Sequence, residues 1–163
     1  MKQKQRFSLI KLRVGVFLFL LVGIFIGFNY FSFGQRLKIS RKKLVRSLEL
    51  ARNYALAGQN SGGGELGYVE VTIDESGVME AWPNGGGSSY YSADVSRKGI
   101  AITVEDDKEI LFRAKDGRML KDSEGLMVPL PTGETVKIVL SGVKGEEETQ
   151  VVEMGALGLV KEE

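Results

Sequence analysis

Few side chains in this sequence could do covalent chemistry. There is no Cys and no His, which excludes thiol nucleophiles, Ser-His-Asp triads, disulfides and the usual structural zinc sites. Two segments match S-x-x-K, in which a nucleophilic serine lies three residues before a lysine: Ser8–Lys11 and Ser40–Lys43. The first borders an apolar run, the second lies in a strongly basic segment, and neither has a partner motif. We therefore expect the chain not to be an enzyme.

Phosphate and metal sites are not indicated either. The glycine-rich segments Ser61–Gly64 and Asn84–Ser89 do not lead into the Gly-Lys-Ser/Thr that a P-loop requires, so we interpret both as connectors. The acidic run Glu105–Asp107 lacks the alternating ligands, the central glycine and the final glutamate of an EF-hand loop. We interpret it as a solvated hairpin tip and expect no cofactor and no metal.

Three aromatic residues, Trp82, Tyr90 and Tyr91, are candidates for contact with a ligand or a partner. Tyr and Trp at strand ends more often complete the edge of a core, because one end of the side chain is apolar and the other is polar. The sequence favours this second interpretation and leaves the first open.

The elements that would position these residues begin with an uncharged apolar run, residues 14–33. Twenty residues of helix are about 30 Å long, which is the thickness of the hydrocarbon core of a bilayer. The run is apolar on all sides, unlike the helix of a soluble core, and it is longer than the apolar part of a secretory signal and has no A-x-A-like cleavage site. It predicts a transmembrane helix.

Charge is distributed unevenly along the chain. Residues 1–60 hold twelve Lys and Arg against the single acid Glu49, a net charge of +11, whereas residues 61–163 hold ten against twenty acids, a net charge of −10. An acidic C-terminal part repels phosphates, so nucleic acid is not an expected partner. Basic clusters flank the apolar run on both sides. The shorter N-terminal flank favours a cytoplasmic N-terminus, with the part of the chain after the apolar run on the outer side of the inner membrane.

Beyond the apolar run, a helical pattern continues as a stem. One apolar stripe recurs at helical spacing and ends before Gly58: Leu37, Leu44, Leu48, Ala51 and Ala55. We predict a continuous helix over residues 7–57 whose stripe packs on the rest of the chain through Leu44, Leu48, Ala51 and Ala55.

From Gly67 onward the apolar period changes to two, which predicts six to eight short strands, most of them antiparallel. Hairpins are expected for residues 68–73 with 78–82, for 100–104 with 109–113, and for 135–140 with 149–154. The expected fold class is α+β, a long N-terminal helix packed on a small antiparallel sheet. The expected parts are a basic leader-like segment (1–13), a transmembrane helix (14–33), a stem (34–58) and a β-rich head (59–163).

Several segments resemble the type IV pilin and type II secretion pseudopilin superfamily, particularly its small-headed minor members. They are Phe7–Leu12 (FSLIKL) ahead of an apolar helix, Leu48–Ala55 (LELARNYA), Phe112–Arg118 (FRAKDGR) and Val152–Val160 (VEMGALGLV). The resemblance implies a non-catalytic subunit of a pilus or secretion filament, at the inner membrane or the cell surface. It also implies other such subunits and the inner-membrane assembly platform as partners, besides the lipid bilayer.

Two positions differ from the family pattern. Arg6 stands where the family has the glycine before its cleavage site, and Lys11 stands where it has a glutamate that pairs with a neighbour's terminal amine. Arg6 leaves processing between Arg6 and Phe7 open. A lysine repels that amine, so standard assembly of the helices also stays open. The alternative is a single-pass anchored β domain that acts as a binding or scaffold module. In either case the basic stem would meet acidic heads or anionic lipid headgroups.

Overall fold

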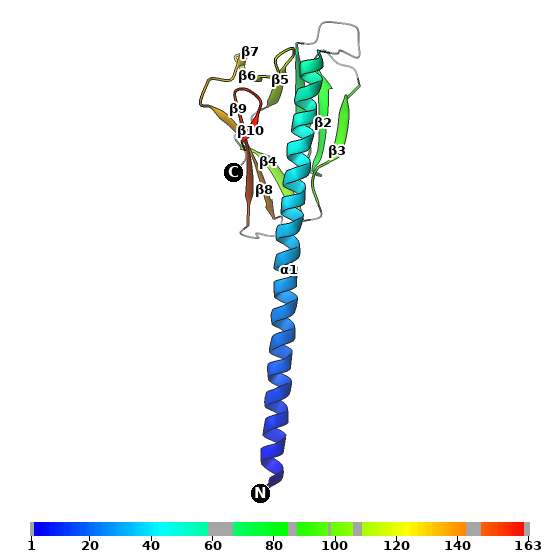
Figure 1. Cartoon of the computed structure of the whole chain (residues 1–163), viewed down its shortest axis with the longest axis vertical. Coiled ribbons are helices and arrows are strands. Elements are labelled where there is room, and N and C mark those ends of the chain that lie inside the picture. Colours follow the sequence, from blue (N-terminus) through cyan, green and yellow to red (C-terminus); the bar gives the residue numbers. More distant parts are fainter. Residues whose placement is uncertain are drawn as a thin grey trace. The chain divides into compact units, whose positions relative to one another are not determined.

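A computed structural model of the chain describes residues 2–58, 67–84, 88–97, 99–105, 109–142 and 148–161, without the side chains of residues 2–10 and 29–31. The chain divides into two compact units, Met1–Arg36 and Leu37–Glu163. The single helix α1 (Lys2–Ala57) supplies all of the first unit's described structure and the first element of the second (Figure 1).

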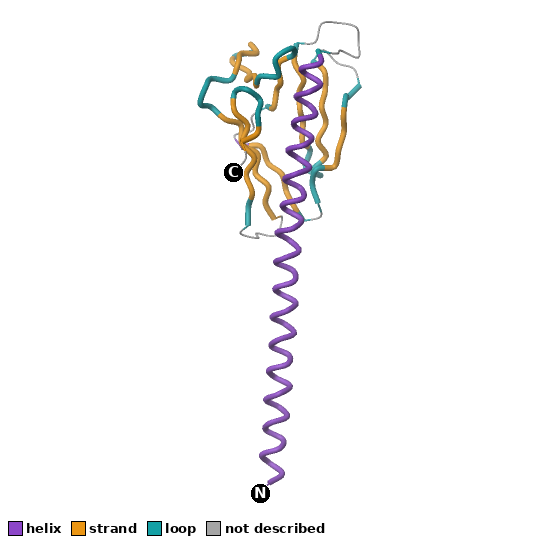
Figure 2. The backbone as a smooth tube through the Cα atoms, in the orientation of Figure 1, coloured by secondary structure: helices purple, strands orange, loops and turns teal. Residues whose placement is uncertain are grey.

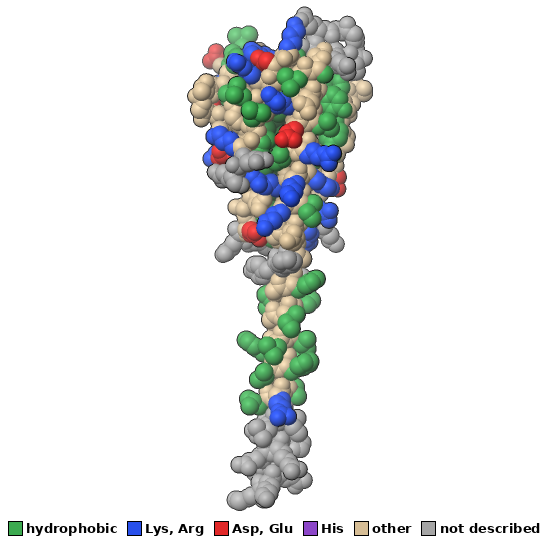
Figure 3. All heavy atoms as spheres, in the orientation of Figure 1, with side chains coloured by type: hydrophobic (Ala, Val, Ile, Leu, Met, Phe, Trp, Pro, Cys, Tyr) green, Lys and Arg blue, Asp and Glu red, His purple; other side chains and the backbone are tan. Residues whose placement is uncertain are grey.

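Along residues 12–28 of the first unit, the large apolar side chains of α1 are exposed. Phe19 is 80% exposed and Phe25 is 71% exposed, and apolar side chains cover this stretch of helix (Figure 3). By length and composition, α1 could cross a membrane. The prediction of one long N-terminal helix is therefore confirmed.

The second unit contains ten strands among the residues that the structure describes, and every pairing between them is antiparallel. Six form one sheet in the order β3-β2-β1-β5-β6-β7. Their bounds are β1 Tyr68–Ile73, β2 Val78–Pro83, β3 Tyr91–Asp94, β5 Ile110–Arg113, β6 Met119–Ser123 and β7 Leu126–Pro129. The other four form a second sheet in the order β10-β9-β8-β4. Their bounds are β4 Ile100–Val104, β8 Thr135–Gly142, β9 Gln150–Gly155 and β10 Val160–Lys161.

Two of the three predicted hairpins are confirmed. β1 pairs with β2 and β8 pairs with β9, each across a local connection. The third prediction is wrong, because β4 pairs with β8 whereas β5 lies between β1 and β6 in the other sheet. The segment Glu105–Asp107 is therefore not the tip of a hairpin but part of a connection between sheets. Of this run only Glu105 is described, and it is exposed.

The core of the second unit is shared between the stem and both sheets. Leu37, Leu44, Ala51 and Ala55 are fully buried, and Leu48 is 1% exposed. In β8, Val136, Ile138 and Leu140 are buried in alternation, and Figure 2 shows residues of α1 running alongside the strands. The α+β class with a helix against antiparallel strands follows from this burial, because each sheet needs an apolar cover on one face.

Candidate functional site

A hollow of about 620 Å³ lies between the stem of α1 and strand β3. Its lining comes from the helix (Lys43, Arg46, Ser47, Glu49, Leu50 and Asn53) and from the strand (Tyr91, Ala93 and Asp94). Because β3 is the last strand of its sheet among the described residues, one side of this hollow is a sheet edge. The sequence analysis did not find this site, since β3 itself was not predicted.

The backbone of β3 alternates between its neighbour and the hollow. Val95 donates its N–H to the carbonyl of Gly77, and the register pairs Met79 with Ala93. In an antiparallel ladder the intervening residues point the other way, so Ser92 and Asp94 direct their backbone groups away from β2. Lys43 Nζ donates to the outward carbonyl of Asp94 over 3.2 Å. The helix therefore covers part of this edge with a lysine.

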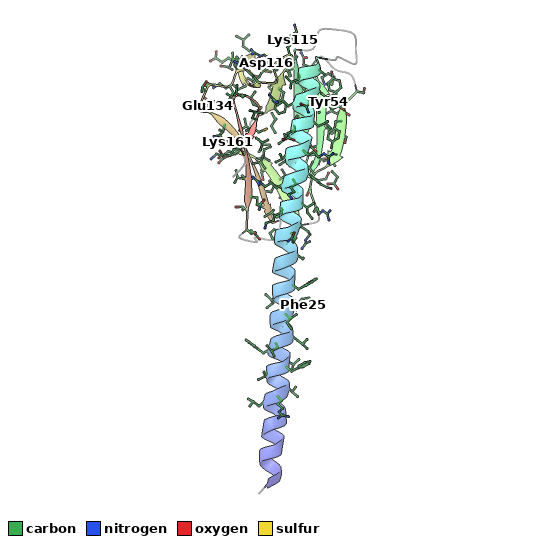
Figure 4. All side chains as sticks on the ribbon, in the orientation of Figure 1. Phe25, Tyr54, Lys115, Asp116, Glu134 and Lys161 are labelled. Atoms are coloured by element: carbon green, nitrogen blue, oxygen red, sulfur yellow. The ribbon has the colours of Figure 1, made fainter. Side chains whose placement is uncertain are left out.

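Two of the three candidate aromatic residues contact the helix. The rings of Tyr90 and Tyr54 are stacked, 5.3 Å apart between centroids and 11° between planes (Figure 4 labels Tyr54). The hydroxyl of Tyr91 lies 3.2 Å from Ser47 Oγ, and Trp82 on β2 is half-buried. Tyr90 and Tyr91 thus help to hold β3 against α1, as expected of aromatics at a core edge.

The S-x-x-K pair Ser40 and Lys43 is divided between two faces of the helix. Ser40 is fully buried, and its hydroxyl has no hydrogen-bond partner among the described residues. Lys43 is exposed and its amino group is bound to the Asp94 carbonyl. Of the other match, Ser8 has no described side chain, and Lys11 is exposed on α1. The proposed processing residues Arg6 and Phe7 lie within α1, and their side chains are outside the described part.

The C-terminal end of α1 is fixed by the turn between β5 and β6. Gly58, in the left-handed conformation, donates to the carbonyl of Ala55, and Lys115 N donates to the same carbonyl over 3.1 Å. Arg52 Nε donates to the carbonyl of Gly117 over 3.3 Å. These contacts satisfy and orient the last helical turn.

An ion pair between two half-buried residues closes the same turn. Arg113 Nε donates to Asp116 Oδ1 over 3.0 Å, and a second guanidinium nitrogen bonds the other oxygen. The Arg113 hydrogen bonds, with smaller contributions from Arg118, lower the pKa of Asp116 to about 2. Figure 4 shows Lys115 and Asp116 in this region. The segment is the FRAKDGR of the sequence, so its polar residues have a structural use here.

The glycine-rich loops are only partly described. Residues 61–64 lie outside the described part, as do residues 85–87. At the start of the second loop, Asn84 Oδ1 accepts from the N–H groups of Gly67 and Tyr68 over 2.7 and 3.1 Å. These partners precede Asn84 by 17 and 16 residues, so the local sequence around the glycine run did not predict the contact. Across the residues that the structure describes, no group of three or more acidic side chains is placed to hold a metal ion.

Comparison of the chain with protein-family models, with curated proteins and with solved structures finds no match. The described residues show three features. Helix α1 has one exposed apolar part and one buried part, its C-terminal end is capped, and the edge strand β3 is partly covered by the helix.

Proposed function

We propose that this protein is a membrane-anchored, non-catalytic subunit of a pilin-like or pseudopilin-like filament system. The observation that supports this proposal is the dual use of α1. Residues 12–28 expose apolar side chains such as Phe19 and Phe25, whereas residues 37–55 bury an apolar stripe among strands. An exposed apolar helix needs lipid or other helices around it, since its transfer from water is favourable by about 25 cal/mol per Å².

The proposed mechanism is mechanical. The apolar part of α1 keeps the subunit in the inner membrane and packs against equivalent helices on assembly, while the β-rich unit makes contacts outside the lipid. The resemblance of FSLIKL, LELARNYA and FRAKDGR to the pilin and pseudopilin superfamily supports this assignment, as does the capping of α1 by the FRAKDGR turn. Its partners would be other filament subunits and the membrane assembly platform.

The absence of cysteine makes a direct test possible. A single cysteine replacing Val22, which is 56% exposed on α1, is introduced into the full chain in cells. With copper phenanthroline added as the oxidant, helix packing within the membrane should yield disulfide-linked dimers between the introduced cysteines of two copies. A matched cysteine replacing Leu126, 70% exposed on β7, controls for random collision. A membrane-bound chain that gives no more adduct through Val22 than through Leu126 would refute the filament proposal.

A second candidate function is an anchored binding or scaffold module outside any filament. The observation that favours it is the basic pair Arg6 and Lys11 at positions where the resembling family has glycine and glutamate. Lys11 is exposed on α1, so it would repel the amine of a neighbouring subunit rather than bind it. The mass of the mature N-terminus separates the two: a chain beginning at Phe7 supports a filament subunit, and one that retains residues 1–6 supports an anchored module.

A further inference from the structure

A band of cations lies on the stem of α1. The band consists of Lys38, Arg41, Lys42, Lys43 and Arg46. All of these side chains except the half-buried Arg41 are exposed, and Figure 3 shows Lys and Arg side chains gathered on this face of the second unit. Within the described residues, none of the five lies in ion-pair distance of a carboxylate, and the nearest acid along the chain, Glu49, is also unpaired there.

Three carboxylates of the β-rich unit differ in this respect. Asp116 binds Arg113, Glu134 binds Lys121, and Glu153 lies within ion-pair distance of both Lys137 and Lys161. Part of the negative charge of this unit is therefore neutralised internally (Figure 4 labels Glu134 and Lys161). The band, which has no such partner among the described residues, is therefore available to an anionic surface outside the chain.

The position of the band along the chain indicates which surface that is. Three residues separate Phe33, the last residue of the apolar run, from Leu37, and the four residue steps between them span at most about 14 Å. From Lys38 to Arg46 the helix rises only about 12 Å. If residues 14–33 lie in a bilayer, the first cations of the band must therefore lie at the level of the lipid headgroups.

Ile39 adds an apolar contact in the middle of the band. It is 37% exposed on α1, between Lys38 and Arg41. Because α1 continues from the apolar run as one helix, Ile39 lies among the cations at the headgroup level, where the cations bind phosphates.

We infer that the basic band binds the headgroups of anionic phospholipids next to the membrane span, with Ile39 among the cations at the headgroup level. This rests on the membrane anchoring part of the proposed function and not on filament assembly. Each cation near an anionic surface contributes about 1 kcal/mol, equivalent to about a fivefold preference. The band thus holds the start of the β-rich unit close to anionic lipid and gives the subunit a preference for membranes that contain it.

The test uses the full chain in bilayer discs of phosphatidylcholine and phosphatidylglycerol in equal amounts. The photoreactive residue p-benzoylphenylalanine replaces Ile39, and mass spectrometry identifies the adducts formed on illumination. We expect lipid adducts in which phosphatidylglycerol exceeds phosphatidylcholine at least about fivefold. The preference should disappear in the combined variant Lys38→Gln, Lys42→Gln, Arg46→Gln and at about 1 M salt, where the Debye length is about 3 Å.

Three controls make the outcomes distinct. The combined variant Lys121→Gln, Lys137→Gln, Lys161→Gln loses the same net charge elsewhere and should keep the preference. A probe that replaces Asn53, exposed two heptads after Ile39, should give no lipid adduct. A probe that replaces Phe19 should react with both lipids equally. If the probe at Phe19 gives no adduct with either lipid, the membrane anchoring of the proposed function is refuted. If the probe at Phe19 does react with lipid, two results of the probe at Ile39 would overturn the inference. They are equal labelling of the two lipids and adducts only to a second copy of the protein.

Discussion

Two buried serines on the stem of α1 differ only in whether their hydroxyl is bonded. Ser40 is fully buried without a partner, whereas Ser47, 3% exposed, lies 3.2 Å from the hydroxyl of Tyr91. A buried hydroxyl without a partner costs about 1–3 kcal/mol, and a made bond contributes about 1 kcal/mol. We expect Ser40→Ala to raise the free energy of unfolding slightly and Ser47→Ala to lower it, a difference of about 1–2 kcal/mol. Urea unfolding in micelles measures both, and equal effects would contradict the assignment.

The ion pair in the β5–β6 turn makes a pH prediction at a single residue. The pKa of Asp116 is about 2 in the folded protein and 3.8 for a free aspartate. The folded state therefore favours the charged form, so its stabilisation is complete above about pH 4 and is lost as the pH falls towards 2. Removing the main cause with Arg113→Gln should raise the pKa of Asp116 towards 3.8, as an NMR titration of its carboxyl carbon would record. Arg97→Gln, at an exposed site outside this turn, should leave the pKa of Asp116 unchanged.

At the scale of elements, three parts meet where α1 ends: the helix, the β5–β6 turn and the β9–β10 turn. Gly158 lies in the last of these at φ +69°, and a Cβ added there would lie 2.3 Å from the carbonyl oxygen of Gly117. Gly133 has a similar φ of +100° with no atom within 4 Å of such a Cβ. Both Gly→Ala variants lose about 1–2 kcal/mol to the left-handed backbone, but Gly158→Ala should lose about 1–3 kcal/mol more because the turns must separate.

The same measurement of unfolding in micelles compares the two glycine variants. If Gly133→Ala and Gly158→Ala were destabilised alike, close contact between the two turns would not contribute to holding the end of α1. A larger loss for Gly158→Ala would show that the sheets and the helix are joined at this point.

At the scale of the whole molecule, the division at Arg36 and Leu37 predicts how the chain tolerates truncation. A chain that lacks residues 1–36 keeps the buried stripe of α1 and should be soluble, with one cooperative unfolding transition. A chain that lacks residues 1–57 loses Leu37, Leu44 and Leu48 from the core, each worth about 1.5–3 kcal/mol. That loss is comparable with the whole stability of a typical domain, about 5–15 kcal/mol.

Gel filtration and circular dichroism of the two truncated chains test this prediction. We expect the shorter chain to aggregate or to lack a cooperative transition. If it folds as well as the longer one, the stem of α1 is an accessory to the β-rich unit and not part of its core.

Local sequence patterns predicted the elements whose structure depends on near neighbours. The uncharged run of residues 14–33 and the stripe that includes Leu44 and Leu48 predicted one long helix, because helical periodicity is a property of residues three and four apart. The stop at Gly58 and the hairpins β1–β2 and β8–β9 were predictable for the same reason. The absence of Cys and His likewise limited the possible chemistry without any structure.

What the sequence by itself determined is therefore the helix, its apolar run, its buried stripe and the separation of a basic stem from an acidic β-rich part. Only the tertiary structure decided that β4 and β5 belong to different sheets, that β3 forms an edge beside α1, and that Lys43 binds the backbone of Asp94. The physical reason is that alternation gives a strand its two faces but not its partner, since pairing depends on which distant strands can bury their apolar faces together.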